Sequence, residues 1–181
     1  MSYRILSLTL ALLIAPVSAR AADAENPFKA AKKGDFAAYK MTTSAGGMSF
    51  EGTLKQTVTA KDDKSATLSA VANVMGMDQP AQETKIDLTK PFDPASSGIP
   101  GGKAKVEKLD SGKETIEIGG KKYECEWIKN KVVAEVNGMK FETETKVWTS
   151  KKVPLGGMVK MEMKNDMFSM KMELTEFGSG K

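Results

Sequence analysis

The chain has no histidine among its 181 residues and only one cysteine. The absence of histidine excludes catalytic groups in which an imidazole activates a serine or a cysteine. It also removes the commonest zinc ligand and the usual general base. A single cysteine cannot form an internal disulfide, so the stability of the fold must come from packing. We therefore expect a protein that is not an enzyme and needs no cofactor.

Carboxylates are the remaining candidates for acid–base chemistry. Glu124 and Glu126 share one side of a predicted strand, and Glu142 and Glu144 do the same further along. Lysines surround both pairs, which is typical of a solvated surface rather than of a catalytic site. These residues are not predicted to be catalytic.

Long apolar runs are also absent, except at the start of the chain. Arg4 is followed by an apolar run over Ile5–Val17 and by the small residues Ser18, Ala19 and Ala21. This order is typical of an export signal, which predicts a signal peptide at residues 1–21 and a periplasmic or secreted protein. An uncleaved anchor is the alternative, although the run is short for a spanning helix. No transmembrane segment is expected after cleavage.

The net charge is small once the signal peptide is removed. The mature chain keeps 25 basic and 23 acidic residues, which gives a net charge of +2. Lysine and glutamate alternate along the predicted strands and do not form a basic patch. No nucleic-acid partner is therefore expected.

The clearest pattern present is a two-residue alternation between Met158 and Phe177. It predicts a β-hairpin with all its large apolar side chains on one face. If Asn165 and Asp166 form the turn, the opposed pairs are Met163 with Phe168, Met161 with Met170 and Val159 with Met172.

The same alternation predicts further hairpins along the chain. Turns at 45–46, 119–120 and 137–138 would oppose Met41 to Phe50, Ile116 to Tyr123 and Ala134 to Phe141. The polar segment 129–131 separates the last two of these hairpins. Trp148 falls out of phase. A bulge near Thr145 could turn it inward, another segment could cover it on the back, or it could be exposed for binding a partner.

The absence of an amphipathic helix after the signal peptide decides the fold class. A sheet with one apolar face needs a second layer, and no helix is available to provide it. The sequence therefore predicts an all-β fold: a strongly curved antiparallel meander of about ten strands that forms a half-barrel or a barrel. Two facing sheets are the alternative.

Three segments make up the predicted domain organisation. Residues 1–21 form the signal peptide, residues 22–34 a leader lying across the sheet, and residues 35–181 a single β domain. A proline- and glycine-rich loop at 90–103 is either a lid over the concave face or a plain surface loop.

A curved sheet would turn its apolar side chains toward a hollow that could hold a lipid or an acyl chain. Eight residues are the predicted ligand-lining set: Phe50, Trp127, Phe141, Met161, Met163, Phe168, Met170 and Met172. Cys125, in phase with Tyr123 and Trp127, is expected to be buried.

Three alternatives to a lipid site remain open. The same side chains could serve only as core. Met161, Met163, Met170 and Met172 could bind Cu(I) through their thioethers, and no other metal site is predicted. The protein could also be a structural or assembly module of an envelope complex, with protein partners that the sequence does not identify.

Two stretches of the C-terminal half carry a resemblance to other proteins. The segments ETIEIGGKKYECEW (Glu114–Trp127) and KVWTSKKVPLGGMVKME (Lys146–Glu162) resemble uncharacterised exported bacterial β-rich proteins, and residues 34–39 extend the match weakly. The overall plan is similar to the half-barrels of periplasmic lipoprotein carriers, without the helices that fill their barrel. The resemblance implies the fold and the compartment, and it assigns no functional residue.

Overall fold

A computed structural model describes residues 26–90, 103–136 and 139–180. This part of the chain is nearly all β, with one short 3₁₀ helix and no α-helix. The elements are β1 (Phe36–Ala45), β2 (Met48–Lys61), β3 (Ser65–Val74), β4 (Met77–Asp78), β5 (Gln82–Asp87), β6 (Lys103–Ile118), β7 (Lys121–Val136), β8 (Met139–Thr149), η1 (Leu155–Gly157), β9 (Met158–Lys164) and β10 (Phe168–Gly178).

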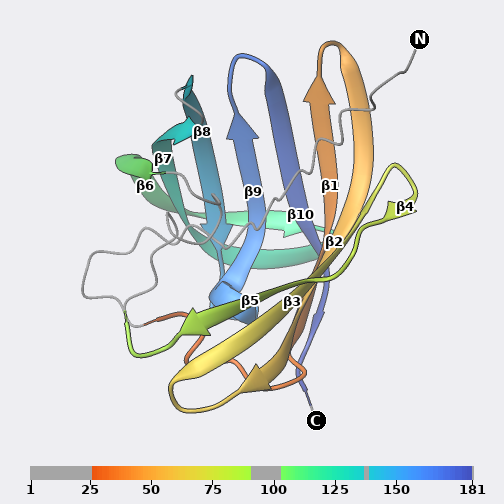
Figure 1. Cartoon of the computed structure of the whole chain (residues 1–181), viewed down its shortest axis with the longest axis vertical. Coiled ribbons are helices and arrows are strands. Elements are labelled where there is room, and N and C mark those ends of the chain that lie inside the picture. Colours follow the sequence, from red (N-terminus) through yellow and green to blue (C-terminus); the bar gives the residue numbers. More distant parts are fainter. Residues whose placement is uncertain (1–25, 91–102, 137–138, 181) are drawn as a thin grey trace.

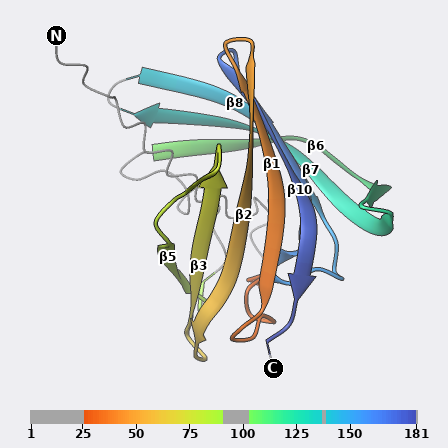
Figure 2. The same cartoon turned by 90° about the vertical axis from the view of Figure 1, so that its right-hand side faces the viewer.

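All ten strands belong to one antiparallel sheet in the order β4-β3-β2-β1-β10-β9-β8-β7-β6, and β5 pairs with β3. The sheet bends so strongly that β6, β7 and β8 cross the direction of β1, β2 and β10 (Figures 1 and 2). It does not close into a barrel. The predicted fold class, a curved half-barrel meander, is confirmed.

Most of the core lies on one face of this sheet, which we call the inner face. Val147 of β8 lies opposite Met161 of β9, Met161 opposite Met172 of β10, and Met172 opposite Met41 of β1. This row crosses four strands, and all four side chains are buried. Burial on one side of each strand follows from the alternation of successive side chains.

The hairpin of β9 and β10 keeps its predicted face but not its predicted register. Met163 lies opposite Met170 and Met161 opposite Met172, two residues from the predicted pairing. The turn is longer than expected because the Asn165 side-chain oxygen accepts hydrogen bonds from the backbone N–H groups of Met167 and Phe168, both at 2.8 Å. An even shift leaves every apolar side chain on the same side.

The first hairpin is also paired two residues from its prediction, although its turn keeps the expected length of two residues. Met41 lies opposite Gly52 instead of Phe50, because the turn uses Gly46 and Gly47, both at positive φ. In contrast, Ile116 opposite Tyr123 is confirmed.

The hairpin of β7 and β8 has its predicted register, with Ala134 opposite Phe141. The polar segment 129–131 does not interrupt the chain: β7 runs through it without a break. Asn130 therefore lies in the middle of a strand, opposite Lys108 of β6 and Thr145 of β8.

The described part of the predicted leader docks onto the sheet. Phe28 is completely buried, and the Asn26 side-chain amide donates a hydrogen bond to the carbonyl oxygen of Asp87 at 3.1 Å. The backbone N–H of Gly34 donates to the carbonyl oxygen of Val58 at 2.8 Å. These bonds fasten the leader to β2 and to the end of β5.

Several sequence predictions fall outside the described residues: the signal peptide at 1–21, the body of the loop at 90–103, and the turn at 137–138. Within the described ranges, no helix has the length and apolar character needed to cross a membrane.

Candidate functional site

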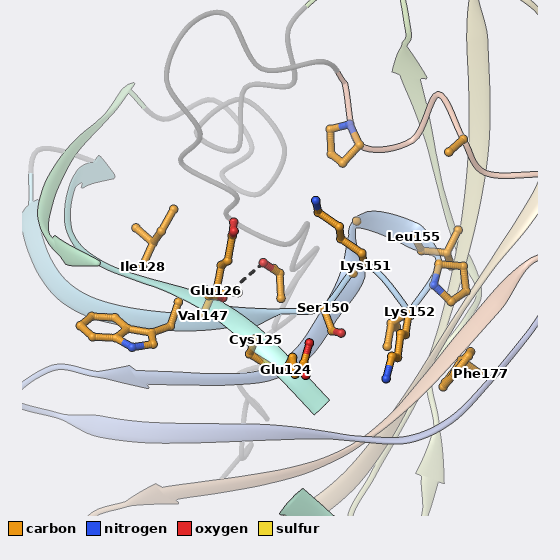
Figure 3. Close-up of a pocket in the computed structure, with 18 of the residues that line it drawn as sticks. Glu124, Cys125, Glu126, Ile128, Val147, Ser150, Lys151, Lys152, Leu155 and Phe177 are labelled. Atoms are coloured by element: carbon orange, nitrogen blue, oxygen red, sulfur yellow. Dashed lines mark hydrogen bonds between the residues drawn. The ribbon is translucent and has the colours of Figure 1, made fainter. Parts of the chain in front are cut away.

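A groove with a volume of about 1560 Å³ lies between strands β6–β8 on one side and the leader and residues 150–157 on the other. Figure 3 shows Ile128 of β7, Val147 of β8 and Leu155 of η1 around it, so its walls come from distant parts of the chain. A concave site of this kind is the usual location for a bound small molecule.

The segment 150–157 forms one wall because it closes on itself. The backbone N–H of Ser150 donates to the carbonyl oxygen of Gly157 at 2.8 Å. A Cβ at Gly157 would lie 2.7 Å from the Ser150 carbonyl oxygen, and Gly157 has a positive φ, so only glycine fits there. This closure holds Leu155 fully buried.

The lining of the groove is amphipathic. Of its apolar lining residues, Ile128 is half-buried, whereas Val147 and Leu155 are almost completely buried. Charged residues also line it: the lysines are 29, 32, 108, 113, 151 and 152, and the carboxylates are Asp35, Glu114, Glu124 and Glu126. Such a surface suits a ligand with both an apolar and a polar part.

Trp148 is buried on the face opposite the methionine row. Its indole N–H donates to the Glu114 carboxylate, and the Lys146 ammonium lies 4.4 Å from its ring and 4.0 Å from that of Trp127. The hydrogen bond from Trp148, and then the positive charge of Lys146, lower the pKa of Glu114. Trp148 is therefore neither exposed nor turned inward by a bulge at Thr145; it is buried on the back of the sheet.

Cys125 is buried, as predicted. Its thiol donates to the Tyr123 carbonyl oxygen at 3.5 Å. Burial, and then the negative charge of Glu114, raise the pKa of the thiol to about 11. The thiol is therefore protonated near neutral pH and is a poor nucleophile, although the residue lines the groove.

Three of the carboxylates considered in the sequence, Glu126, Glu142 and Glu144, form ion pairs with lysines. Lys131 lies 2.7 Å from Glu142, and Lys129 lies 2.8 Å from Glu144. These contacts are typical of a solvated strand face. That the chain is not an enzyme stays a prediction.

The eight predicted ligand-lining residues occupy three kinds of place. Trp127 lines the groove. Met161, Met170 and Met172 are buried in the core row and its neighbours, while Phe50, Phe141, Met163 and Phe168 are half-buried elsewhere on the sheet.

The alternation marks the apolar face, but it carries no signal for the leader and the 150–157 loop, which form much of the groove. Those segments have no regular period, so the sequence analysis missed their contribution.

The four methionines proposed for Cu(I) form two directly opposed pairs, Met163 with Met170 and Met161 with Met172. Met161 and Met172 are completely buried. A copper ion there would have to lie within the core, and copper binding stays a prediction.

No protein-family model matches the sequence, and no curated protein matches it significantly. Two solved structures share its fold. One, from Bacteroides fragilis, is named as an exported protein with a YmcC-like fold. It is 12% identical, with a TM-score of 0.52, over 85% of this chain and 100% of that one.

The second, from Parabacteroides distasonis, is named as a lipoprotein. It is 11% identical, with a TM-score of 0.54, over 84% of this chain and 99% of that one. At these identities the likeness shows the fold. The predicted resemblance to exported β-rich proteins is confirmed at that level, and it agrees with the predicted periplasmic or secreted location.

Proposed function

We propose that this exported protein binds a hydrophobic ligand, a lipid or an acyl chain, in the groove between β6–β8 and the leader, and that it catalyses no reaction. The observation that carries the proposal is the groove itself, with about 1560 Å³ of space and an amphipathic lining. Pockets for compact small molecules usually measure roughly 300–1,000 Å³. A longer, flexible ligand is better matched to this volume.

The charges of the groove support a ligand with one polar end. Lys151 and Lys152 lie on the 150–157 wall and are exposed, while Ile128 and Val147 lie on the strands opposite (Figure 3). An acyl chain could contact the apolar strands while its polar end faces the lysines and water.

Filling the groove should prevent binding. In Ile128→Trp, a larger side chain would occupy the space beside Val147, whereas Val71→Trp places the same ring on β3 at a position that is already 44% exposed. Both variants and the wild type would be exported, purified without detergent and extracted, and acyl-containing lipids would be measured by mass spectrometry. We expect the wild type and Val71→Trp to carry lipid and Ile128→Trp to carry several-fold less.

Circular dichroism confirms that each variant is folded before its lipid content is compared. A wild type that carries no lipid and binds no acyl probe in titration would contradict the proposal. Equal lipid in a folded Ile128→Trp would contradict the assignment of the groove.

A further inference from the structure

Asn130 of β7 and Thr145 of β8 form a directly opposed polar pair on the inner face. Asn130 is completely buried, and Thr145 is 3% exposed. The Asn130 amide nitrogen, the Asn130 amide oxygen and the Thr145 hydroxyl have no hydrogen-bond partner. Three unpartnered atoms are thus concentrated at one place in the described structure.

Buried polar atoms without partners destabilise a fold unless a bound molecule supplies the missing hydrogen bonds. A buried donor or acceptor without a partner loses its bonds to water and gains nothing in exchange. Apolar side chains lie on both sides of the pair along the strands: Ile128 and Val147 on one side, and Val132 on the other. A valine or a leucine would therefore suit this face, and the polar side chains have no structural role that the contacts reveal.

Asn130 and Thr145 do not themselves line the groove, but their neighbours do. Ile128, which lines the groove, lies two residues from Asn130 on the same side of β7. Lys108, which also lines the groove, lies directly opposite Asn130 on β6. On the other side, Thr145 lies opposite Met163. The pair therefore lies between the lined groove and the methionines of β9 and β10.

We propose that Asn130 and Thr145 bind the polar group at which an acyl chain is attached, an inference that rests on the proposed function. The amide N–H group needs an acceptor and the amide oxygen needs a donor. The hydroxyl can donate a hydrogen bond or accept one. A group that carries a carbonyl together with a hydroxyl or an N–H satisfies all three atoms. Partly esterified glycerol and substituted fatty amides have this chemistry.

A fatty acid anion or a simple ester fits less well. Both offer acceptors only, so the Asn130 amide oxygen would stay without a partner. Rotating the amide by half a turn exchanges its oxygen and nitrogen but leaves the same two requirements. The pair therefore selects for a neutral acyl ligand with a donor near its carbonyl.

Two probes with the same chain separate these cases: monolauroylglycerol, which has hydroxyl donors, and methyl laurate, which has none. Binding would be measured by displacement of a fluorescent apolar dye from the full exported protein, below the concentration at which the probes aggregate. We expect the wild type to prefer the glycerol ester by about tenfold, about 1.4 kcal/mol.

The variants Asn130→Leu and Thr145→Val remove the polar atoms at nearly constant shape. In each, the preference for the glycerol ester should fall to about twofold or less, while the thermal midpoint rises because the buried atoms no longer lack partners. Thr143→Val makes the same chemical change on the same strand and face, two residues away, where the side chain is half-buried. It should keep the wild-type preference.

The outcomes distinguish this inference from the proposed function. If the wild type binds both probes equally, or if Asn130→Leu and Thr145→Val keep the full preference, the polar pair does not recognise the ligand, although the groove still binds acyl chains. If the wild type binds neither probe, both proposals fail. Thr145→Val is nearly isosteric, so it keeps the test valid if Asn130→Leu does not fold.

Discussion

Lys146 lies between the rings of Trp127 and Trp148, and Lys160 lies 4.7 Å from the ring of Trp148. A cation over an aromatic face is attracted by the negative charge of that face, and more strongly where water is excluded. The indole N–H of the buried Trp148 also needs an acceptor, which Glu114 provides. Glu114 thus provides the acceptor that Trp148 needs, and the two rings attract the charge of Lys146.

Replacing Glu114 by glutamine should make stability depend on pH in a defined direction. The pKa of Glu114 in the folded protein lies below its ordinary value of 4.5. Its charge therefore stabilises the fold above about pH 4.5, and this contribution is lost as the pH falls through the lower, folded-state pKa. Thermal midpoints of Glu114→Gln and the wild type should differ at neutral pH and converge in acid.

The matched control for that measurement is Glu117→Gln, because Glu117 is exposed on the same strand. Its difference from the wild type should be small at every pH. A Glu114→Gln difference that stays constant from neutral pH down to about pH 3, well below the ordinary pKa of a glutamate, would show that the carboxylate charge does not stabilise this cluster.

At the scale of the element, the hairpins show what an alternating pattern determines. The β9–β10 and β1–β2 hairpins are both paired two residues from their predicted register, and both keep the predicted apolar face. Alternation specifies the side on which a residue lies, because its period is two. The residue opposite it depends on the turn. In β9–β10 the Asn165 side chain stabilises a longer turn than predicted, whereas in β1–β2 the two-residue turn lies at Gly46 and Gly47 instead of at 45–46.

A substitution of Met161 tests how much the row of buried side chains on the inner face contributes to stability. Met161 is completely buried between Val147 and Met172, so Met161→Ala should lower the free energy of unfolding by about 2–5 kcal/mol. Met167→Ala, in the turn of the same hairpin and 63% exposed, should change it by no more than about 0.5 kcal/mol. Urea unfolding followed by tryptophan fluorescence measures both values. Similar values for the two variants would mean that the methionine row is not the core.

At the scale of the whole molecule, irregular segments cover much of the inner face in place of helices. Phe28 of the leader and Leu155 of the 150–157 segment are both almost fully buried. The Asp35 carboxylate accepts hydrogen bonds from the backbone N–H groups of Lys32 at 2.8 Å and Gly180 at 2.9 Å. This carboxylate thus connects the leader to the end of β10, and the groove is formed where these segments meet β6–β8.

Removal of the Phe28 ring should show that the leader is part of the fold. We expect Phe28→Ala to reduce the free energy of unfolding by about 3–5 kcal/mol, because the ring is completely buried. Lys33→Ala, in the same segment but exposed, is the control and should have little effect. Chemical denaturation of both variants gives the comparison. If Phe28→Ala is as stable as Lys33→Ala, the leader does not pack against the sheet in solution.

The sequence by itself determined the fold class, the apolar face of each hairpin and the burial of Met161, Met172 and Cys125. These features follow from the local period of two and from the absence of helical segments. Only the tertiary structure decided which residues surround the groove and that Asn130, in a segment resembling a polar turn, lies buried beside Thr145. The reason is physical: strand alternation is a local property, whereas the groove and the unpartnered pair depend on contacts between residues far apart in the chain.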